Sequence, residues 1–241
     1  MNSRTADTAI IVFLVLAIAA SSFSVYLHLS DRNEDEKGAK ELMSSVLEIT
    51  CSDDDSNKVC GTGFIIDHDG SYILTNAHMV VREKNGVKGT YSIIEGKFAN
   101  KDQRYELEVI GYDEDMDAAL LGFKEDVDVR PLKIQTTRPD YGERVTVIGN
   151  ALGYGLSMKD CVVSLPELNI RYNGTERNVI MISVTINHGD SGSPIINGRG
   201  EVIGMCSFKL KDDGVTVEGM SYGLTAGSIS RFLDGMSGRV S

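Results

Sequence analysis

Short apolar runs separated by turn residues recur along most of this chain, and this pattern limits the folds it can adopt. Gly63–Ile66 and Tyr72–Thr75, for example, flank the turn sequence Asp67-His68-Asp69-Gly70. Short strands bounded by Gly, Asp and Asn predict a β-barrel or a β-sandwich, and the pattern does not choose between them. The further predicted strands are Tyr91–Ile94, Tyr105–Ile110, Ala118–Phe123, Arg144–Ile148, Lys159–Leu165, Asn178–Val184, Ser193–Ile196, Val202–Ser207 and Met220–Leu224.

A terminal helix is the one helical pattern in the C-terminal part of the chain. Ile229, Phe232 and Leu233 fall on one helical face within Ser228–Asp234, and Gly235 follows as a stop signal. The 241 residues are 41% apolar, which is enough for one sizeable core or two small ones. The net charge of −11 argues against binding to nucleic acid, whose phosphates would be repelled.

A serine between two glycines, in His188-Gly189-Asp190-Ser191-Gly192-Ser193-Pro194, is the strongest candidate for chemistry. The glycines allow a tight turn and the close approach of a substrate. Backbone N–H groups in such a turn can converge on a developing oxyanion. Gly-Asp-Ser-Gly also occurs in ordinary turns, so the motif needs partner residues elsewhere in the chain.

Both partners of a serine nucleophile are present. His78 closely follows the short apolar run Tyr72–Thr75, and Asp117 stands directly before the apolar run Ala118–Leu121. An imidazole can remove the serine proton, and a carboxylate can hold the imidazole in the required tautomer. Asp113 and Asp115 are local rivals, but Asp117 is favoured because it immediately precedes the strand. We therefore predict His78, Asp117 and Ser191 as the catalytic residues.

The chain resembles the trypsin-like serine proteases of the chymotrypsin-fold clan, most closely the HtrA (Deg) family. The resemblance implies an all-β fold of two antiparallel six-stranded β-barrels with a short C-terminal helix, and a triad in the cleft between the barrels. We expect an N-terminal barrel over residues 42–135, and a C-terminal barrel with the terminal helix over residues 136–241. The matching segments are Gly61–Ile66, Asp69–His78, Asp117–Leu121, Val147–Gly153, Gly189–Pro194 and Gly200–Gly204.

The resemblance also implies an oxyanion hole made by the backbone N–H groups of Gly189 and Ser191. The chain departs from the HtrA pattern here, because Asp190 replaces the usual asparagine and Ser193 replaces a second glycine. In digestive relatives, an aspartate at the position of Asp190 pairs with a newly cut N-terminus. No such cut is evident in this sequence, so we expect a basic side chain or a backbone donor near Asp190.

Substrate-binding residues are predicted at Thr185, His188, Phe208 and Leu224. Thr185 stands six positions before Ser191, where relatives that cut after Lys or Arg carry an acidic residue. We therefore expect a small or medium apolar side chain before the cleaved bond. The resemblance implies protein or peptide substrates, no cofactor and no metal, and it allows a homo-oligomer. We also expect no PDZ domain after the protease region, although most HtrA relatives carry one.

The N-terminal segment differs in kind from the rest of the chain. Thr8–Leu29 contains 22 residues without Asp, Glu, Lys or Arg. As a helix it would reach about 33 Å, enough to cross a hydrocarbon core of about 30 Å. We therefore expect a single transmembrane anchor within residues 1–30, followed by a charged linker over residues 31–41. A cleaved signal peptide is the alternative, because Ala17-Ile18-Ala19 fits a cleavage site.

The four cysteines give one predicted disulfide, Cys51–Cys60. The two residues flank a polar segment that we expect to be a hairpin loop, which would bring them close together. Free thiols are the alternative for this pair. Cys161 and Cys206 lie in predicted apolar strands. For these two residues, buried free thiols are at least as favourable as a disulfide.

The sequence as a whole predicts a membrane-anchored serine endopeptidase whose catalytic domain lies outside the cytoplasm. One arginine, Arg4, precedes the apolar segment and mostly acidic residues follow it, which favours a cytoplasmic N-terminus. The alternative is a catalytically silent module with a protease fold that binds peptides or a protein partner.

Overall fold

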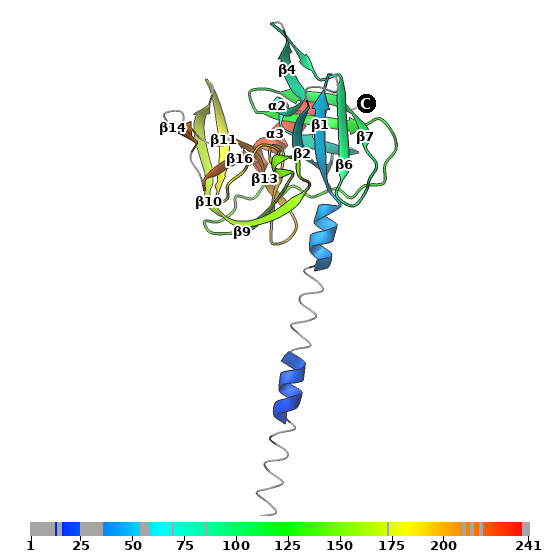
Figure 1. The fold of residues 1–241 in the computed structure, drawn as a ribbon. Coiled ribbons are helices and arrows are strands. Elements are labelled where there is room, and N and C mark those ends of the chain that lie inside the picture. Colours follow the sequence, from blue (N-terminus) through cyan, green and yellow to red (C-terminus); the bar gives the residue numbers. More distant parts are fainter. Residues whose placement is uncertain are drawn as a thin grey trace, which may run out of the picture. The chain divides into compact units, whose positions relative to one another are not determined.

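The computed structural model describes residues 13, 16–24, 36–53, 58–68, 70–84, 86–172, 174–208, 211–212, 215–216 and 219–237. The chain divides into two compact units, Met1–Glu41 and Leu42–Ser241. Residues 16–24 and 36–43 are helical. Strands make up most of the second unit, and Figure 1 shows their course.

The first six-stranded barrel closes in the order β1-β2-β3-β8-β7-β6, with every neighbouring pair antiparallel. A short helix, α2 (Ala77–Val80), follows β3 and carries His78. A separate two-stranded sheet, β4–β5, follows α2. The strands of this half are β1 (Val46–Ser52), β2 (Val59–Asp67), β3 (Ser71–Thr75), β4 (Val81–Lys84), β5 (Val87–Thr90), β6 (Ile93–Phe98), β7 (Tyr105–Asp113) and β8 (Ala118–Phe123).

The second six-stranded barrel closes in the order β10-β11-β16-β13-β12-β9, again with antiparallel pairs. A 3₁₀ turn, η1 (Ala151–Gly153), joins its first two strands, and α3 (Ala226–Met236) ends the fold. The strands of this half are β9 (Arg144–Gly149), β10 (Ser157–Tyr172), β11 (Thr175–Ile182), β12 (Pro194–Asn197), β13 (Val202–Phe208), β14 (Lys211–Asp212), β15 (Val215–Thr216) and β16 (Ser221–Thr225).

Strand β8 shows how one apolar run serves two cores. Successive side chains of a strand point to opposite faces. Ala119 and Leu121 therefore fill the first barrel, whereas Ala118 and Leu120 join a cluster that extends into the second half of the fold. All four residues are fully buried, which explains why this strand is apolar throughout rather than alternating.

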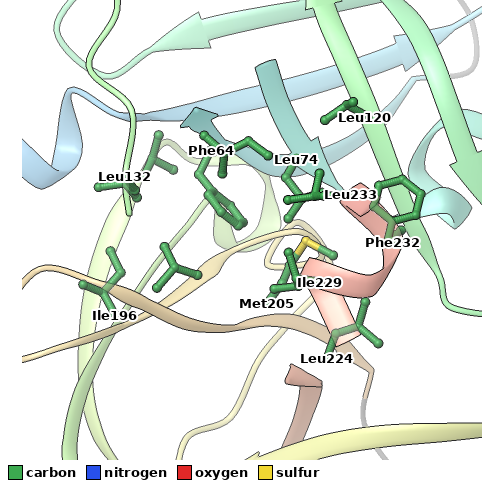
Figure 2. Close-up of a cluster of buried hydrophobic side chains, with 14 of the residues drawn as sticks. Phe64, Leu74, Leu120, Leu132, Ile196, Met205, Leu224, Ile229, Phe232 and Leu233 are labelled. Atoms are coloured by element: carbon green, nitrogen blue, oxygen red, sulfur yellow. The ribbon is translucent and has the colours of Figure 1, made fainter. Parts of the chain in front are cut away.

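The largest apolar cluster joins the two barrels. Phe64 and Leu74 come from the first barrel, Met205 and Leu224 from the second, and Phe232 from α3 (Figure 2). Burying each such side chain stabilises the fold by about 1.5–3 kcal/mol, so this cluster fixes one barrel against the other. Helix α3 is capped by the Thr225 hydroxyl, which accepts a hydrogen bond from the Ser228 N–H at 3.2 Å.

The structure adds elements that the apolar pattern did not indicate. The β10–β11 hairpin extends to Tyr172 and Thr175, well beyond the predicted Lys159–Leu165 strand. Its outer part carries Glu167, Asn169 and Arg171 rather than a continuous apolar run. Helix α2 and the β4–β5 sheet were likewise not predicted.

The prediction of a Cys51–Cys60 disulfide is wrong. Both residues are free thiols, with Cys51 buried and Cys60 exposed. Cys51 pairs with Val59, and Cys60 pairs with Thr50. Neighbouring register positions point to opposite faces of the sheet, so the two thiols lie on different sides of it. Burial raises the pKa of the Cys51 thiol to about 12.

The predicted anchor over residues 8–29 falls mostly outside the described residues, which in this region are Phe13 and residues 16–24. Within the described part of the chain, no helix is long and apolar enough to cross a membrane.

Candidate active site

His78 and Asp117 meet at the edge of the first barrel. His78 lies on α2, and Asp117 lies in the turn directly before β8, with a positive φ of 58°. His78 Nδ1 lies 2.9 Å and 3.0 Å from the two carboxylate oxygens of Asp117. The backbone N–H of His78 also donates to Asp117 Oδ1 at 3.1 Å. Since a carboxylate only accepts, Nδ1 carries the proton, and the Nε2 atom of a neutral His78 is left as an acceptor.

Asp117 is buried and held by donors on several sides. The Asn76 side chain donates to the Asp117 carbonyl oxygen at 2.9 Å, and the Ser207 hydroxyl donates to Oδ2 at 2.5 Å. Burial acts to raise the pKa of the Asp117 carboxyl. The hydrogen bonds and charge of His78, together with the Ser207 hydroxyl, outweigh burial and lower the pKa below its usual value. The carboxylate is therefore ionised beside the imidazole at neutral pH.

Arg177 ties this turn to the β10–β11 hairpin. Its guanidinium donates to the carbonyl oxygens of Asp115 and Glu114 at 2.8 Å and 3.0 Å. It also lies 3.8 Å from Asp117 Oδ2, and its side chain is 9% exposed. An open pocket of about 460 Å³ lies here, with His78, Asp117, Tyr172, Arg177 and Ser207 among its lining residues. A residue of the second barrel thus helps to fix the position of an aspartate of the first.

The turn that carries Ser191 is anchored to the first barrel through Thr62. The Thr62 N–H donates to the Ser191 carbonyl at 2.9 Å, and the Thr62 hydroxyl donates to the Gly189 carbonyl at 2.7 Å. The Thr75 hydroxyl in turn donates to the Thr62 carbonyl at 2.7 Å. A Cβ at Gly192 would overlap the Thr62 carbonyl, which explains the requirement for glycine beside the serine.

Two backbone N–H groups of this turn have no acceptor in the described part of the structure. Between residues 189 and 193, the amides of Asp190, Gly192 and Ser193 donate to the carbonyls of Asn187, Cys206 and Asp190, respectively. Among the described residues, the amides of Gly189 and Ser191 have no hydrogen-bond acceptor. The His188 carbonyl accepts a 2.6 Å bond from the Leu152 N–H. Since peptide groups are trans, the Gly189 N–H points away from that bond.

The Ser191 hydroxyl forms no hydrogen bond with His78 among the described residues. Such contacts between a nucleophile and its base are often long in a free enzyme and shorten when substrate binds. The structure thus brings His78 and Asp117 into direct contact. It places Ser191 in a turn that the first barrel holds through Thr62.

The predicted substrate-binding residues have different surroundings. Thr185 is half-buried, and its hydroxyl accepts a hydrogen bond from the Gly219 N–H at 3.2 Å. His188 is exposed beside the Ser191 turn, and Phe208 lies on β13 opposite Tyr222. Leu224 is 1% exposed and packs in the cluster between the barrels. Its side chain therefore faces the core rather than a substrate, which corrects the prediction for this residue.

Four residues that matter here were missed in the sequence: Thr62, Arg177, Ser207, and Lys159, whose Nζ atom lies 2.5 Å from Asp190 Oδ2. Each lies on a different strand, and none forms a local motif with the residue that it contacts. The one available signal was Ser207, a polar residue near the end of the apolar strand that follows the Ser191 turn. No cluster of three or more metal-binding side chains occurs within the described ranges.

Comparison with known proteins gives the family of the chain and agrees with its fold. Residues 61–205 match the family described as the trypsin-like peptidase domain. A probable serine protease do-like from Buchnera aphidicola is 32% identical over 68% of this chain and 33% of its own length. The serine endoprotease DegS from Escherichia coli is 29% identical over 73% of this chain and 48% of its own length.

A solved structure has the same fold. The active form of the Rv3671c protease from M. tuberculosis superposes with a TM-score of 0.70, over 83% of each chain and at 23% identity. Two closed six-stranded barrels joined in one chain are the architecture of the chymotrypsin-like fold. The chain belongs to the trypsin-like serine proteases and is a homologue of the HtrA, DegP and DegS proteins. It spans about a third to a half of the length of these relatives.

The lowered pKa of Asp117 predicts a pH-dependent contribution to stability. A depressed pKa stabilises the folded state above the ordinary carboxyl value of about 4, and this contribution is lost as the pH falls through the lower folded value. Asp117→Asn should therefore lower the free energy of unfolding more at pH 7 than at pH 3, measured by urea titration. Asp102→Asn, at an exposed carboxylate, is the matched control and should show no such gap. An equal loss at both pH values for Asp117→Asn would contradict this account.

Proposed function

We propose that this protein is a serine endopeptidase in which Ser191 is the nucleophile, His78 the general base and Asp117 the residue that orients the imidazole. One observation carries the proposal. In the Ser191 turn, the amides of Gly189 and Ser191 have no acceptor among the described residues, while Asp117 fixes His78 with Nδ1 as a donor. The first feature supplies an oxyanion hole, and the second supplies a base.

The reaction would proceed through an acyl-enzyme. Ser191 Oγ attacks the carbonyl carbon of the peptide bond and passes its proton to His78 Nε2. The carbonyl oxygen becomes an oxyanion that accepts hydrogen bonds from the Gly189 and Ser191 amides. When the C–N bond breaks, His78 gives its proton to the leaving amine. A water molecule then repeats the sequence and releases the carboxylic acid.

Each part of this arrangement contributes a sizeable factor to the rate. Loss of one oxyanion donor costs about 10²–10³ in rate in proteases of this kind. Loss of the carboxylate that orients the histidine costs about 10⁴, because the imidazole then adopts the wrong tautomer. The Ser207 hydroxyl and Arg177 would support Asp117 in that task through the contacts described above.

Labelling with a fluorophosphonate probe tests the proposal directly. The wild-type chain should be modified at one serine, and Ser191→Ala should lose the modification entirely, as read by intact mass. Ser71→Ala, at an exposed strand serine, is the control and should label like wild type. A folded wild-type protein that no probe modifies would favour the silent peptide-binding module instead.

We further propose a preference for small or medium apolar side chains before the cleaved bond. The support is Thr185, six positions before Ser191, where relatives that cut after Lys or Arg carry an acidic residue. Thr185 has a hydroxyl instead of a carboxylate, and this hydroxyl accepts a hydrogen bond from the Gly219 amide. Thr185→Asp should raise the ratio of cleavage after Arg or Lys to cleavage after Ala or Val by at least about tenfold, the order of one charged hydrogen bond. A peptide library measures this ratio. Wild-type cleavage that already favours Arg or Lys would overturn the proposal.

We also propose that residues 8–29 anchor the protein in a membrane, with the protease domain outside the cytoplasm and protein or peptide substrates there. The support is the apolar, uncharged character of these 22 residues and the relative named a probable periplasmic serine endoprotease. We place the two barrel domains at residues 42–135 and 136–241.

The full-length chain should stay with membranes after alkaline carbonate extraction, whereas a chain that begins at residue 42 should be released. Release of the full-length chain would contradict the anchor.

A further inference from the structure

A partly buried ion pair joins the Ser191 turn to β10. Asp190 is fully buried, and Lys159 Nζ lies 2.5 Å from its Oδ2 atom. Lys159 comes from β10, where it pairs with Val147 of β9, and its side chain is 20% exposed. The partner of Asp190 that the sequence left open is therefore a lysine from a neighbouring strand.

The Asp190 carboxylate also shapes the backbone of the turn. Its Oδ2 atom accepts a hydrogen bond from the Asn187 N–H at 2.7 Å. The Asp190 N–H donates to the Asn187 carbonyl at 3.0 Å, and the Asp190 carbonyl accepts from the Ser193 N–H at 3.0 Å. One carboxylate oxygen thus joins Lys159 to the segment that precedes the serine. The two amides without acceptors, those of Gly189 and Ser191, flank Asp190 on either side.

The Asp190 carboxylate is fully buried and closely packed against Gly149. Its other oxygen, Oδ1, has no hydrogen-bond partner in the described part of the chain. A Cβ at Gly149 would overlap both this oxygen and the Ser193 hydroxyl. Burial without a cation is costly for a carboxylate, because water no longer solvates the charge. Loss of Lys159 would leave the charge uncompensated, and the turn would have to rearrange to bring it to water.

We infer that Lys159 is a positioning residue for catalysis: it neutralises the buried Asp190 carboxylate, and so keeps the turn in the geometry in which the Gly189 and Ser191 amides receive the oxyanion. Because the cation is a side chain within β10, this geometry forms in the intact chain and needs no cut to create a new N-terminus. The inference rests on the proposed protease function and adds a residue to its machinery. It also accounts for an aspartate at position 190 in place of the asparagine expected there.

Kinetics with a p-nitrophenyl ester and the full-length chain test this inference. Lys159→Met should lower kcat by about 10²–10³, the loss expected when an oxyanion donor is misplaced, while KM changes little. Lys159→Arg should keep more of the wild-type kcat than Lys159→Met does. Lys124→Met is the matched control: it removes an exposed lysine that pairs with Glu106 at 3.2 Å, and it should not change kcat.

The double variant Lys159→Met with Asp190→Asn separates positioning from simple instability. Asparagine carries no charge, so removal of both partners leaves no uncompensated carboxylate. The double variant should recover kcat to within about tenfold of wild type, whether or not the single variant folds. Asp190→Asn alone should cost less than Lys159→Met, because the half-buried lysine can extend its amine to solvent.

The outcomes are distinguishable. Wild type that is not labelled by fluorophosphonate refutes the proposed function, not this inference alone. Wild type that is labelled, with Lys159→Met as active as Lys124→Met, overturns the inference. A double variant that is unfolded, or no more active than Lys159→Met, also overturns it. Wild type that is labelled only after its chain is cut would contradict assembly of the site in the intact chain.

Discussion

Phe64 and Leu74 of the first barrel pack against Met205 and Leu224 of the second, and this apolar contact fixes the relative position of the two barrels (Figure 2). The candidate site needs that constraint, because His78 and Asp117 belong to the first half and Ser191 to the second. Polar contacts then refine the alignment. Thr62 of the first barrel binds the Ser191 turn, and Arg177 and Ser207 of the second contact the Asp117 turn or its carboxylate. The apolar core thus sets the coarse position, and hydrogen bonds that cross between the barrels set the fine one.

The proposed chemistry depends on two buried carboxylates, and the fold stabilises them differently. Asp117 is stabilised mostly by hydrogen bonds from His78 and Ser207, which keep it ionised and aimed at the imidazole. Asp190 is stabilised by the full charge of Lys159 and by the Asn187 amide. In the proposed mechanism, the first carboxylate orients the base, and the second keeps the amides of the turn in place. Burial of either charge without its partners would be costly, so the partners belong to the site as much as the carboxylates do.

The catalytic candidates could be predicted from the sequence because each lies in a local motif, such as the glycines around Ser191 or the strand after Asp117. Their supporting residues could not, because Lys159, Arg177 and Thr62 reach the site only through the pairing of distant strands. Register also explains the errors. The spacing of Cys51 and Cys60 suggested a bridge, yet a shift of one residue places their side chains on opposite faces. Leu224 lies on β16, but its side chain points into the core and not toward a substrate.

The amplitude of the first turnover tests most directly whether these two barrels form a working acylation site. When the full-length protein is mixed with excess p-nitrophenyl ester, the account predicts a rapid burst of about one p-nitrophenol per chain, followed by slow turnover. Ser191→Ala should abolish the burst. A folded wild-type chain that gives no burst, or a burst that survives Ser191→Ala, would contradict the account.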